Sequence, residues 1–386
     1  MRLSLLCLLL FVSVNAIAQR ITLGAERTGE YLSELKNKKI ALVVNHTSLI
    51  GKTHLVDSFL KLGLNIQTIF APEHGFRGNV SAGNTVSNGK DEKTGIKIIS
   101  LYGNHKKPYP EDLKGIDYVV FDIQDVGVRF YTYISTMHYV MEACAEQKVP
   151  FMVLDRPNPN GHYVDGPVLD TNFRSFVGMH PIPIVHGCTV GELALMINGQ
   201  GWLNKGIKCQ LKVISCVNYT HHTPYILPIR PSPNLQTQSA IYLYPSICLF
   251  EGTTMSLGQG TDKPYQCFGS PAFDWGNLKF TPISIKGVAE KPKSLGIPCT
   301  GFDLTWYGFN RAYDEAEINL NWLILSYRLS KNQNQFFNDF FDKLAGNNKL
   351  RQQIKSGKSA DEIKADWAKD LERYLILRRP YLLYDL

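Results

Sequence analysis

Five short apolar runs alternate with stretches of helical periodicity through the first half of the chain. We predict strands at Lys39–Val44, Ile66–Phe70, Lys97–Leu101, Tyr118–Phe121 and Phe151–Leu154. We predict helices between them, notably at Thr53–Leu62 and Tyr131–Gln147. The runs are nearly free of polar residues, which is typical of parallel strands covered on both faces. Strands that alternate with helices in this way indicate an α/β fold with a doubly wound parallel sheet.

The pattern changes near residue 189. Thr189-Val-Gly-Glu192 is a capping box, which predicts a helix through about Asn198. Proline and glycine are frequent between 223 and 301, and Leu211–Val217 and Ile241–Leu243 have the composition of strands. These features predict that a second unit with both helices and strands begins here.

The last part of the chain, from Glu315 onward, has helical periodicity. Apolar residues recur there at helix spacing, namely Ile318, Trp322, Leu325 and Leu329. Ser359-Ala-Asp-Glu362 is a second capping box before the final helix. We therefore predict a first domain over residues 19–188 and a smaller α+β domain over residues 189–386.

Each predicted strand of the first half ends in polar residues. The carboxyl ends of parallel strands lie at one edge of a sheet, so these exits lie near one another. Open parallel sheets bind ligands in the crevice beyond this edge. Turn chemistry accounts for some Asn and Asp, but less readily for Glu, His, Arg and Gln. The exits contain Asn45 and His46, then Glu73 and His74, then Tyr102, then Asp122, Gln124 and Asp125, and finally Asp155 and Arg156. The sequence therefore predicts one site at this edge of the sheet.

The first residues have the features of a secretory signal peptide. A basic start at Arg2 precedes an apolar stretch, and Ala16-Ile17-Ala18 is a small-x-small cleavage signature. We expect cleavage after residue 18 and a mature chain that starts at Gln19 and lies in the periplasm or outside the cell. No later segment approaches about 18 unbroken apolar residues, so no stable membrane insertion is expected after cleavage.

Seven cysteines remain after the signal peptide, and they are scattered singly without Cys-x-x-Cys spacing. Most are interpreted as small buried apolar residues, although a disulfide between Cys209 and Cys216, or between Cys248 and Cys267, stays open. The formal net charge of +7 is spread along the 386 residues without basic runs, so we expect no nucleic-acid partner.

Several familiar motifs are absent from the sequence. No Gly-x-Gly-x-x-Gly, Walker A or Gly-x-Ser-x-Gly motif is present, which disfavours a dinucleotide, a nucleotide and an α/β-hydrolase serine. A zinc ion could be imagined among His46, His74 and Asp122 or Asp125, but no His-x-x-x-His pair anchors such a site. We therefore expect no cofactor and no catalytic metal.

Two glutamates remain as candidates for catalysis. Glu73 follows a predicted strand between Pro72 and Gly75, where partial desolvation raises a carboxyl pKa and suits a general acid. Glu251 lies in the glycine-rich segment 250–264. Glycosidases commonly use two carboxylates that flank the scissile bond, so one from each domain across a cleft is plausible. In the alternative interpretation, Glu251 binds backbone amides of its own loop.

Five long motifs carry a resemblance to a known family. They are FAPEHGFRG (70–78), YVVFDIQDVGVRFYTY (118–133), VLDRPNPNGHYVDGP (153–167), PSPNLQT (231–237) and LFEGTTMSLGQGTDKP (249–264). Together they resemble the NamZ-type exo-β-N-acetylmuramidases of bacterial cell-wall recycling, over nearly the whole mature chain. The resemblance implies a Rossmann-like domain, a smaller second domain and an active site in the cleft between them. It also implies release of N-acetylmuramic acid from the non-reducing ends of peptidoglycan fragments, with Glu73 as general acid. Where the family pattern is expected to have Gly-Arg-Gly-Thr, this chain has Gly258-Gln259-Gly260-Thr261.

N-acetylmuramic acid carries a lactyl carboxylate, which arginine binds well through paired hydrogen bonds. Arg77, Arg129 and Arg156 are the candidates for this contact, and Tyr131 could pack on a sugar face. The full set of predicted substrate-binding residues is Asn45, His74, Arg77, Asp122, Gln124, Asp125, Arg129, Tyr131, Asp155 and Arg156. The expected partner is a peptidoglycan-derived muroglycan. Two other classes stay open, a non-catalytic peptidoglycan-binding protein and a metal-dependent cell-wall amidase.

Overall fold

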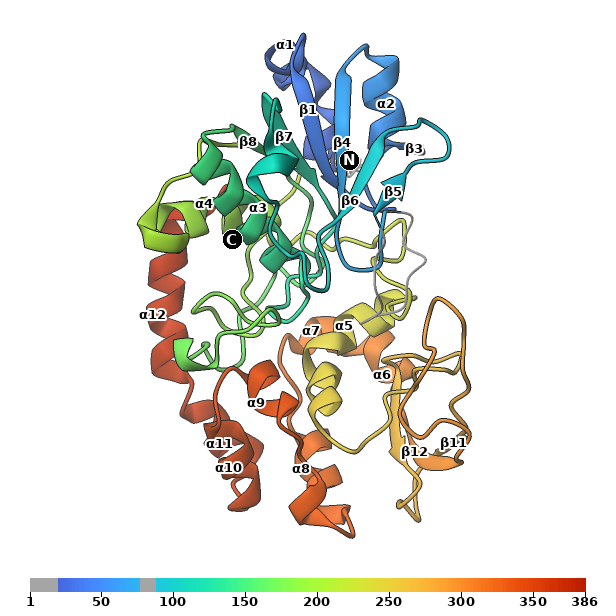
Figure 1. Cartoon of the computed structure of the whole chain (residues 1–386). Helices are drawn as coiled ribbons and strands as arrows, with labels where there is room; N and C mark the ends of the chain where they lie inside the picture. The colour runs from blue at the N-terminus through green and yellow to red at the C-terminus, as the bar shows by residue number, and fades with distance from the viewer. Residues whose placement is uncertain (1–19, 77–87) are drawn as a thin grey trace, which may run out of the picture.

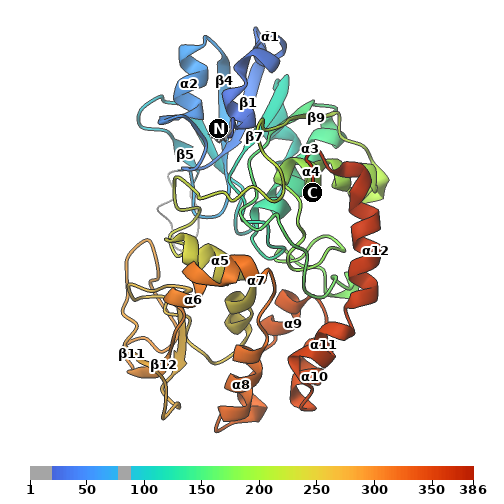
Figure 2. The same ribbon diagram turned by 180° about the vertical axis from the view of Figure 1, so that it is seen from behind.

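The structure is a computed structural model, and it describes residues 20–76 and 88–386. The predicted signal peptide and Arg77 lie outside the described residues. A sheet-containing domain and a smaller domain lie one above the other, and the C-terminal helix α12 runs along the side of both (Figures 1 and 2).

The larger domain contains a seven-stranded sheet in the order β5-β6-β4-β1-β7-β8-β9. All neighbouring strands are parallel except β5 and β6. The strands are β1 (Lys39–Val44), β4 (Asn65–Ala71), β5 (Gly89–Lys90), β6 (Lys97–Ser100), β7 (Tyr118–Asp122), β8 (Phe151–Leu154) and β9 (Leu211–Ile214). The chain winds outward from β1 in both directions, so the predicted doubly wound sheet is confirmed, and its switch point lies between β1 and β7.

Alternate residues of the central strands are buried in two different clusters. On β1, Ala41 and Val43 belong to one cluster, whereas Leu42 and Val44 belong to the other. Helices α3 (Tyr133–Gln147) and α4 (Val190–Gly199) contribute to the first cluster, and α1 (Leu32–Leu35) and α2 (Leu55–Lys61) to the second. The sheet is therefore covered on both faces, which explains why its strands are continuous apolar runs.

The predicted elements of the first half are confirmed to within a few residues at their ends. The capping box at Thr189 is also confirmed, because the Thr189 side chain accepts a hydrogen bond from the Glu192 amide at the start of α4. Helix α4 packs on the sheet and β9 pairs with β8, so the chain leaves this domain later than the predicted boundary at 188/189.

The smaller domain combines an antiparallel sheet with short helices. The sheet has three strands in the order β10-β12-β11, which are β10 (Cys267–Ser270), β11 (Leu278–Phe280) and β12 (Cys299–Asp303). The helices are α5 (Gln238–Ile247), the 3₁₀ helix η6 (Cys248–Gly252), α6 (Thr305–Asn310), α7 (Ala312–Glu315), α8 (Asn321–Leu329), α9 (Phe340–Ala345), α10 (Lys349–Lys355), α11 (Ala360–Ala365) and α12 (Ala368–Arg378). The predicted combination of a Rossmann-like domain with a smaller α+β domain is thus confirmed.

One element was predicted wrongly. Ile241–Leu243, expected as a strand, lies inside helix α5. The Thr237 side chain caps this helix by accepting a hydrogen bond from the Ala240 amide, at 3.1 Å. A short apolar run has the same composition in a buried helix and in a buried strand, and here the cap determines the outcome.

The last part of the chain is helical as predicted, but the capping box at Ser359 opens α11 and not the last α-helix, α12. Ser359 caps α11 through the Glu362 amide, and Trp322, Leu325 and Leu329 lie on α8, whereas Ile318 precedes that helix. After α12 the chain returns to the sheet domain, where the Tyr384 hydroxyl donates to the carboxylate of Asp155 at 2.6 Å. No helix of the described residues is long and apolar enough to cross a membrane.

Candidate active site

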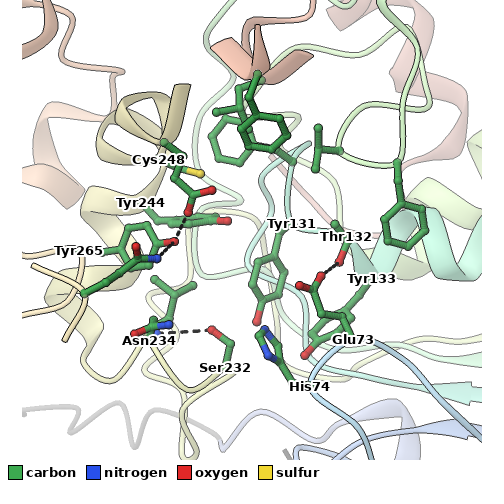
Figure 3. Close-up of a pocket in the computed structure, with 18 of the residues that line it drawn as sticks. Glu73, His74, Tyr131, Thr132, Tyr133, Ser232, Asn234, Tyr244, Cys248 and Tyr265 are labelled. Atoms are coloured by element: carbon green, nitrogen blue, oxygen red, sulfur yellow. Dashed lines mark hydrogen bonds between the residues drawn. The ribbon is translucent and has the colours of Figure 1, made fainter. Parts of the chain in front are cut away.

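A cavity of about 440 Å³ lies between the two domains. Its volume falls within the usual range of small-molecule sites. Figure 3 shows Glu73, His74 and Tyr131 to Tyr133 on one side, and Tyr244, Cys248 and Tyr265 on the other. The first group belongs to the sheet domain and the second to the smaller domain, so both domains build the cavity.

Glu73 lies in a tight turn directly after β4. The Gly75 amide closes the turn on the Pro72 carbonyl at 3.0 Å, and His74 has a positive φ of 68°. A left-handed conformation is uncommon for a residue with a side chain and is typical of a turn that the surrounding structure holds in place. The Thr132 hydroxyl donates to Oε2 of Glu73 at 2.6 Å (Figure 3). The turn and this hydrogen bond hold the Glu73 carboxyl at the cavity wall.

Glu251 reaches the same cavity from the smaller domain. Its carboxylate accepts a short hydrogen bond from the Tyr265 hydroxyl, which in turn accepts one from Nε2 of Gln259 at 3.1 Å. Burial raises the pKa of Glu251, and the negative charge of Glu73 raises it further, while the Tyr265 hydrogen bond lowers it. Glu73 and Glu251 are therefore electrostatically coupled across the cavity.

The turn that carries Glu251 is held from two sides. Gly252 lies so close to α9 that a Cβ atom there would come within 2.3 Å of Cα of Phe341. The Lys293 ammonium donates to the carbonyls of Phe250, Glu251 and Thr253 at 3.0, 2.8 and 2.5 Å. Burial lowers the pKa of Lys293 to about 8. The position of Glu251 thus depends on a close helix contact and on a partly buried cation.

Aromatic rings form much of the remaining wall. Tyr131 packs edge-on against Tyr133 and Tyr244, with ring centroids 4.9 and 5.8 Å apart. Tyr244 in turn packs edge-on against Tyr265 at 5.2 Å. Such rings offer apolar faces beside hydroxyl groups, which suits the alternating apolar and polar surface of a sugar ring.

Arg129 does not line the cavity. Its guanidinium is fully buried and donates to four carbonyls, those of Pro167, Ile182, Leu344 and Ala345, at 2.7 to 2.9 Å. The first two carbonyls belong to the sheet domain and the last two to α9. Arg129 therefore ties the two domains together beside the cavity.

Arg156 also does not line this cavity, because its guanidinium binds other groups of the protein. It forms a buried, bidentate pair with Asp122 at 2.5 and 2.9 Å, and it donates to the Leu49 carbonyl. Arg156 and Gln124 line a second cavity of about 310 Å³ beyond the carboxyl ends of β1, β7 and β8. Nε2 of the Gln124 side chain donates to the carbonyls of Asp125 and Pro157, both at 2.8 Å.

The other predicted residues at the strand exits organise loops. The Asn45 side chain accepts from the amide and the hydroxyl of Thr47, and Asp125 accepts from the Gly127 amide at 2.7 Å. Asp155 accepts from Thr189, from the Gly191 amide and from Tyr384. Burial raises the pKa of Asp125 to about 7 and that of Asp155 to about 6. Of the predicted residues that the structure describes, Glu73, His74, Tyr102, Tyr131 and Glu251 line the larger cavity.

The sequence did not identify several residues that line this cavity as site residues. They are Thr132, Ser232, Asn234, Tyr244, Gln259, Tyr265, Lys291 and Lys293, among others. Several lie within the long motifs, but both lysines come from the loop between β11 and β12, which carries no motif.

Residues 20–76 and 88–386 contain no group of three or more His, Cys, Asp or Glu side chains arranged to hold a metal ion. The seven cysteines of the described chain are buried and unpaired, so neither disulfide that the sequence left open is formed.

Comparisons with known proteins match this architecture. Residues 40–239 match the family model for the N-terminal part of the exo-β-N-acetylmuramidase NamZ, and residues 242–384 match that for its C-terminal part. The two matched regions meet close to the start of α5. By these matches the chain is a glycoside hydrolase built from an α/β domain and a smaller domain.

Similar proteins identify the family. The chain is 38% identical over 379 residues to the peptidoglycan β-N-acetylmuramidase NamZ of Bacillus subtilis (strain 168), covering 92% of this chain and 89% of that protein. It therefore belongs to the exo-β-N-acetylmuramidase NamZ family. Two solved structures of DUF1343 family proteins from Bacteroides fragilis NCTC 9343 share the fold, with TM-scores of 0.88 and 0.77 at 50% and 28% identity. Both alignments cover 95% of this chain and 99% of the other.

Proposed function

We propose that this protein is an exo-acting glycoside hydrolase that releases N-acetylmuramic acid from the non-reducing ends of peptidoglycan fragments. The observation that carries the proposal is the pair of carboxyl groups, Glu73 and Glu251, which reach one cavity from two domains. Most glycosidases use two carboxyl groups that flank the glycosidic bond. Family membership supports the muramyl sugar as the substrate unit.

In this proposal Glu73 is the general acid. It donates a proton to the glycosidic oxygen as the bond to the anomeric carbon breaks, so that the leaving sugar departs as an alcohol. The Thr132 hydroxyl, 2.6 Å from Oε2, orients the carboxyl for this transfer. Glu251 is the second carboxyl group, and it stabilises the positive charge that develops at the anomeric carbon. The oxygen of a water molecule adds to that carbon, and the water gives up a proton, so N-acetylmuramic acid is released as the free sugar and the proton lost by Glu73 is replaced.

The two carboxyl groups influence each other across the cavity. Burial and the negative charge of Glu73 raise the pKa of Glu251, while the Tyr265 hydrogen bond and the charge of Lys293 lower it. The assignment of Glu73 as the acid rests on its place at the exit of β4 and on the Thr132 hydrogen bond.

The test is a comparison of Glu73→Gln with wild type on two substrates. On a muramyl disaccharide, whose leaving group requires protonation, we expect a loss of about 10²- to 10⁴-fold in kcat. On a dinitrophenyl muraminide, whose leaving group departs without a proton, we expect a much smaller loss. Glu111→Gln is the matched control, because Glu111 is exposed and lies outside the cavity.

Three outcomes would contradict the proposal. A folded Glu73→Gln variant with normal turnover of the disaccharide would remove Glu73 from catalysis. Equal losses on both substrates would show that it does not act as the proton donor. Wild-type protein that binds muroglycans without cleaving them would be a peptidoglycan-binding protein rather than an enzyme.

We further propose that the mature protein starts at Gln19 and acts in the periplasm or outside the cell. The basic start, the apolar stretch and Ala16-Ile17-Ala18 support this location. N-terminal sequencing of protein from a periplasmic extract checks it, and a fractionated protein that retains Met1 would contradict it.

A further inference from the structure

The described wall of the larger cavity carries two lysines, Lys291 and Lys293, and both belong to the loop between β11 and β12. Two of the arginines expected to bind an anionic substrate, Arg129 and Arg156, do not line this cavity. An anionic ligand must nevertheless enter a space that already contains Glu73 and Glu251. Such a ligand requires a cation to offset the repulsion.

Lys293 has no donor left for a ligand. An ammonium group has three N–H donors, and those of Lys293 already serve the carbonyls of Phe250, Glu251 and Thr253. Lys293 therefore holds the protein chain in place and does not bind substrate directly.

The anchoring of Lys293 also fixes the position of Lys291. Between the two lysines, Pro292 is buried and packs towards Gly260, where a Cβ atom would lie 2.8 Å from Cγ of the proline. Both lysines of this bend and turn lie in the cavity wall. Lys293 is partly buried, whereas Lys291 is exposed, so Lys291 lies at the open rim.

Within the described part of the chain, Lys291 forms no ion pair or hydrogen bond, whereas many other lysines are paired with carboxylates. Its ammonium group is thus available to a ligand. An unpaired cation at the rim of a cavity that holds two carboxyl groups suits a ligand whose anionic group lies away from the reacting bond.

We propose that Lys291 binds the lactyl carboxylate of the terminal sugar and makes the site selective for N-acetylmuramyl over N-acetylglucosaminyl units. This inference rests on the proposed function, because it assigns one contact within the same site. The two sugars differ by the lactyl group, so a positive charge placed where that carboxylate lies separates them. A neutral sugar gains nothing from the charge of the lysine, whereas the muramyl sugar gains an ion pair that offsets the repulsion of its carboxylate by the two glutamates.

The experiment compares Lys291→Met with wild type in two measurements. The first is calorimetric binding of free N-acetylmuramic acid and of free N-acetylglucosamine. The second is kcat/KM on matched chromogenic glycosides of the two sugars. We expect binding and kcat/KM for the muramyl ligand to fall on the order of tenfold, with little change for the glucosaminyl ligand. Lys291→Arg should restore the preference.

Lys286→Met is the matched control, since Lys286 is exposed on the same loop and does not line the cavity. Added salt should weaken muramyl binding in wild type more than in Lys291→Met, because salt screens an exposed ion pair. The Lys286→Met control and the salt dependence can both be interpreted whichever residue is the general acid.

Several results would overturn the inference. One is an unchanged ratio of muramyl to glucosaminyl kcat/KM in Lys291→Met. Another is a selective loss in Arg77→Met with none in Lys291→Met, which would assign the carboxylate to Arg77. If wild type binds N-acetylmuramic acid through Lys291 but cleaves nothing, the proposed function fails and the inference stands. If wild type cleaves muramyl substrates and Lys291→Met keeps the preference, the inference fails alone.

Discussion

Replacing Arg129 by methionine tests whether this arginine binds substrate, as its position in the sequence suggested, or stabilises the protein, as its contacts indicate. Methionine keeps much of the volume of the side chain but removes its charge and its donors. Four carbonyls lose their partners, two in the sheet domain and two on α9. The variant should therefore weaken the connection between the domains.

Two opposing effects set the magnitude. Hydrogen bonds to a charged group contribute about 1.5–3 kcal/mol each, so the loss of four removes roughly 6–12 kcal/mol. Burial lowers the pKa of Arg129 from 12.5 to about 9, which corresponds to a cost of about 5 kcal/mol for the buried charge that the variant avoids. The net destabilisation is then roughly 1–7 kcal/mol, a range that includes the cost of breaking a buried charged pair.

Urea unfolding followed by tryptophan fluorescence measures this change. Arg373→Met is the control, because Arg373 is exposed and makes one ion pair with Asp370 at 3.3 Å, and its loss should change the unfolding free energy by less than about 1 kcal/mol. The folded Arg129→Met variant should lose muramyl and glucosaminyl activity in the same proportion. A stable variant that selectively loses the muramyl substrate would refute the reasoning and return Arg129 to substrate binding.

Two further predictions follow from the buried carboxyl groups. Tyr265→Phe removes a hydrogen bond that lowers the pKa of Glu251, so the limb of the pH profile of kcat/KM that reports Glu251 should move to higher pH, and a move to lower pH would contradict this. In the folded state Asp125 keeps its proton up to about pH 7, whereas the unfolded state releases it near 3.8, so the free energy of unfolding falls as the pH rises between these values. Asp125→Asn should therefore gain stability relative to wild type, on the order of 2–4 kcal/mol, when urea unfolding is compared at about pH 8 and about pH 5. A constant difference would show that Asp125 is ionised in both states.

The sheet was predictable because its signal is local. Parallel strands buried on both faces must be apolar throughout, and the five runs of the first half satisfy that requirement without reference to the rest of the chain. Ile241–Leu243 shows the limit of this argument, because three apolar residues are compatible with a strand or a helix. The domain boundary was harder for a similar reason. Strand β9 joins the sheet by pairing with β8 across a long separation in sequence, which local composition does not report.

The candidate site was predictable only in part. Glu73 and His74 stand out because a charged tight turn follows a buried strand, and both line the cavity. Asp155 and Arg156 follow another strand of the same sheet, β8, in the same manner, yet they bind other parts of the protein. In both cases an acidic residue and a basic residue come shortly after the end of a buried strand. Only the surrounding packing separates a side chain that faces a ligand from one that stabilises a loop.

The sequence by itself determined the class of fold, the turn at Glu73 and the family, since these depend on residue periodicity, local turn chemistry and motifs. The tertiary structure determined which charged side chains are available to bind a ligand. Arg129 and Arg156 resemble ligand-binding cations in the sequence, but buried carbonyls and Asp122 already occupy their donors. Lys291 has no motif around it, yet the anchoring of Lys293 holds it at the rim of the cavity. A hydrogen-bond donor can serve few acceptors at once, and long-range packing selects those acceptors.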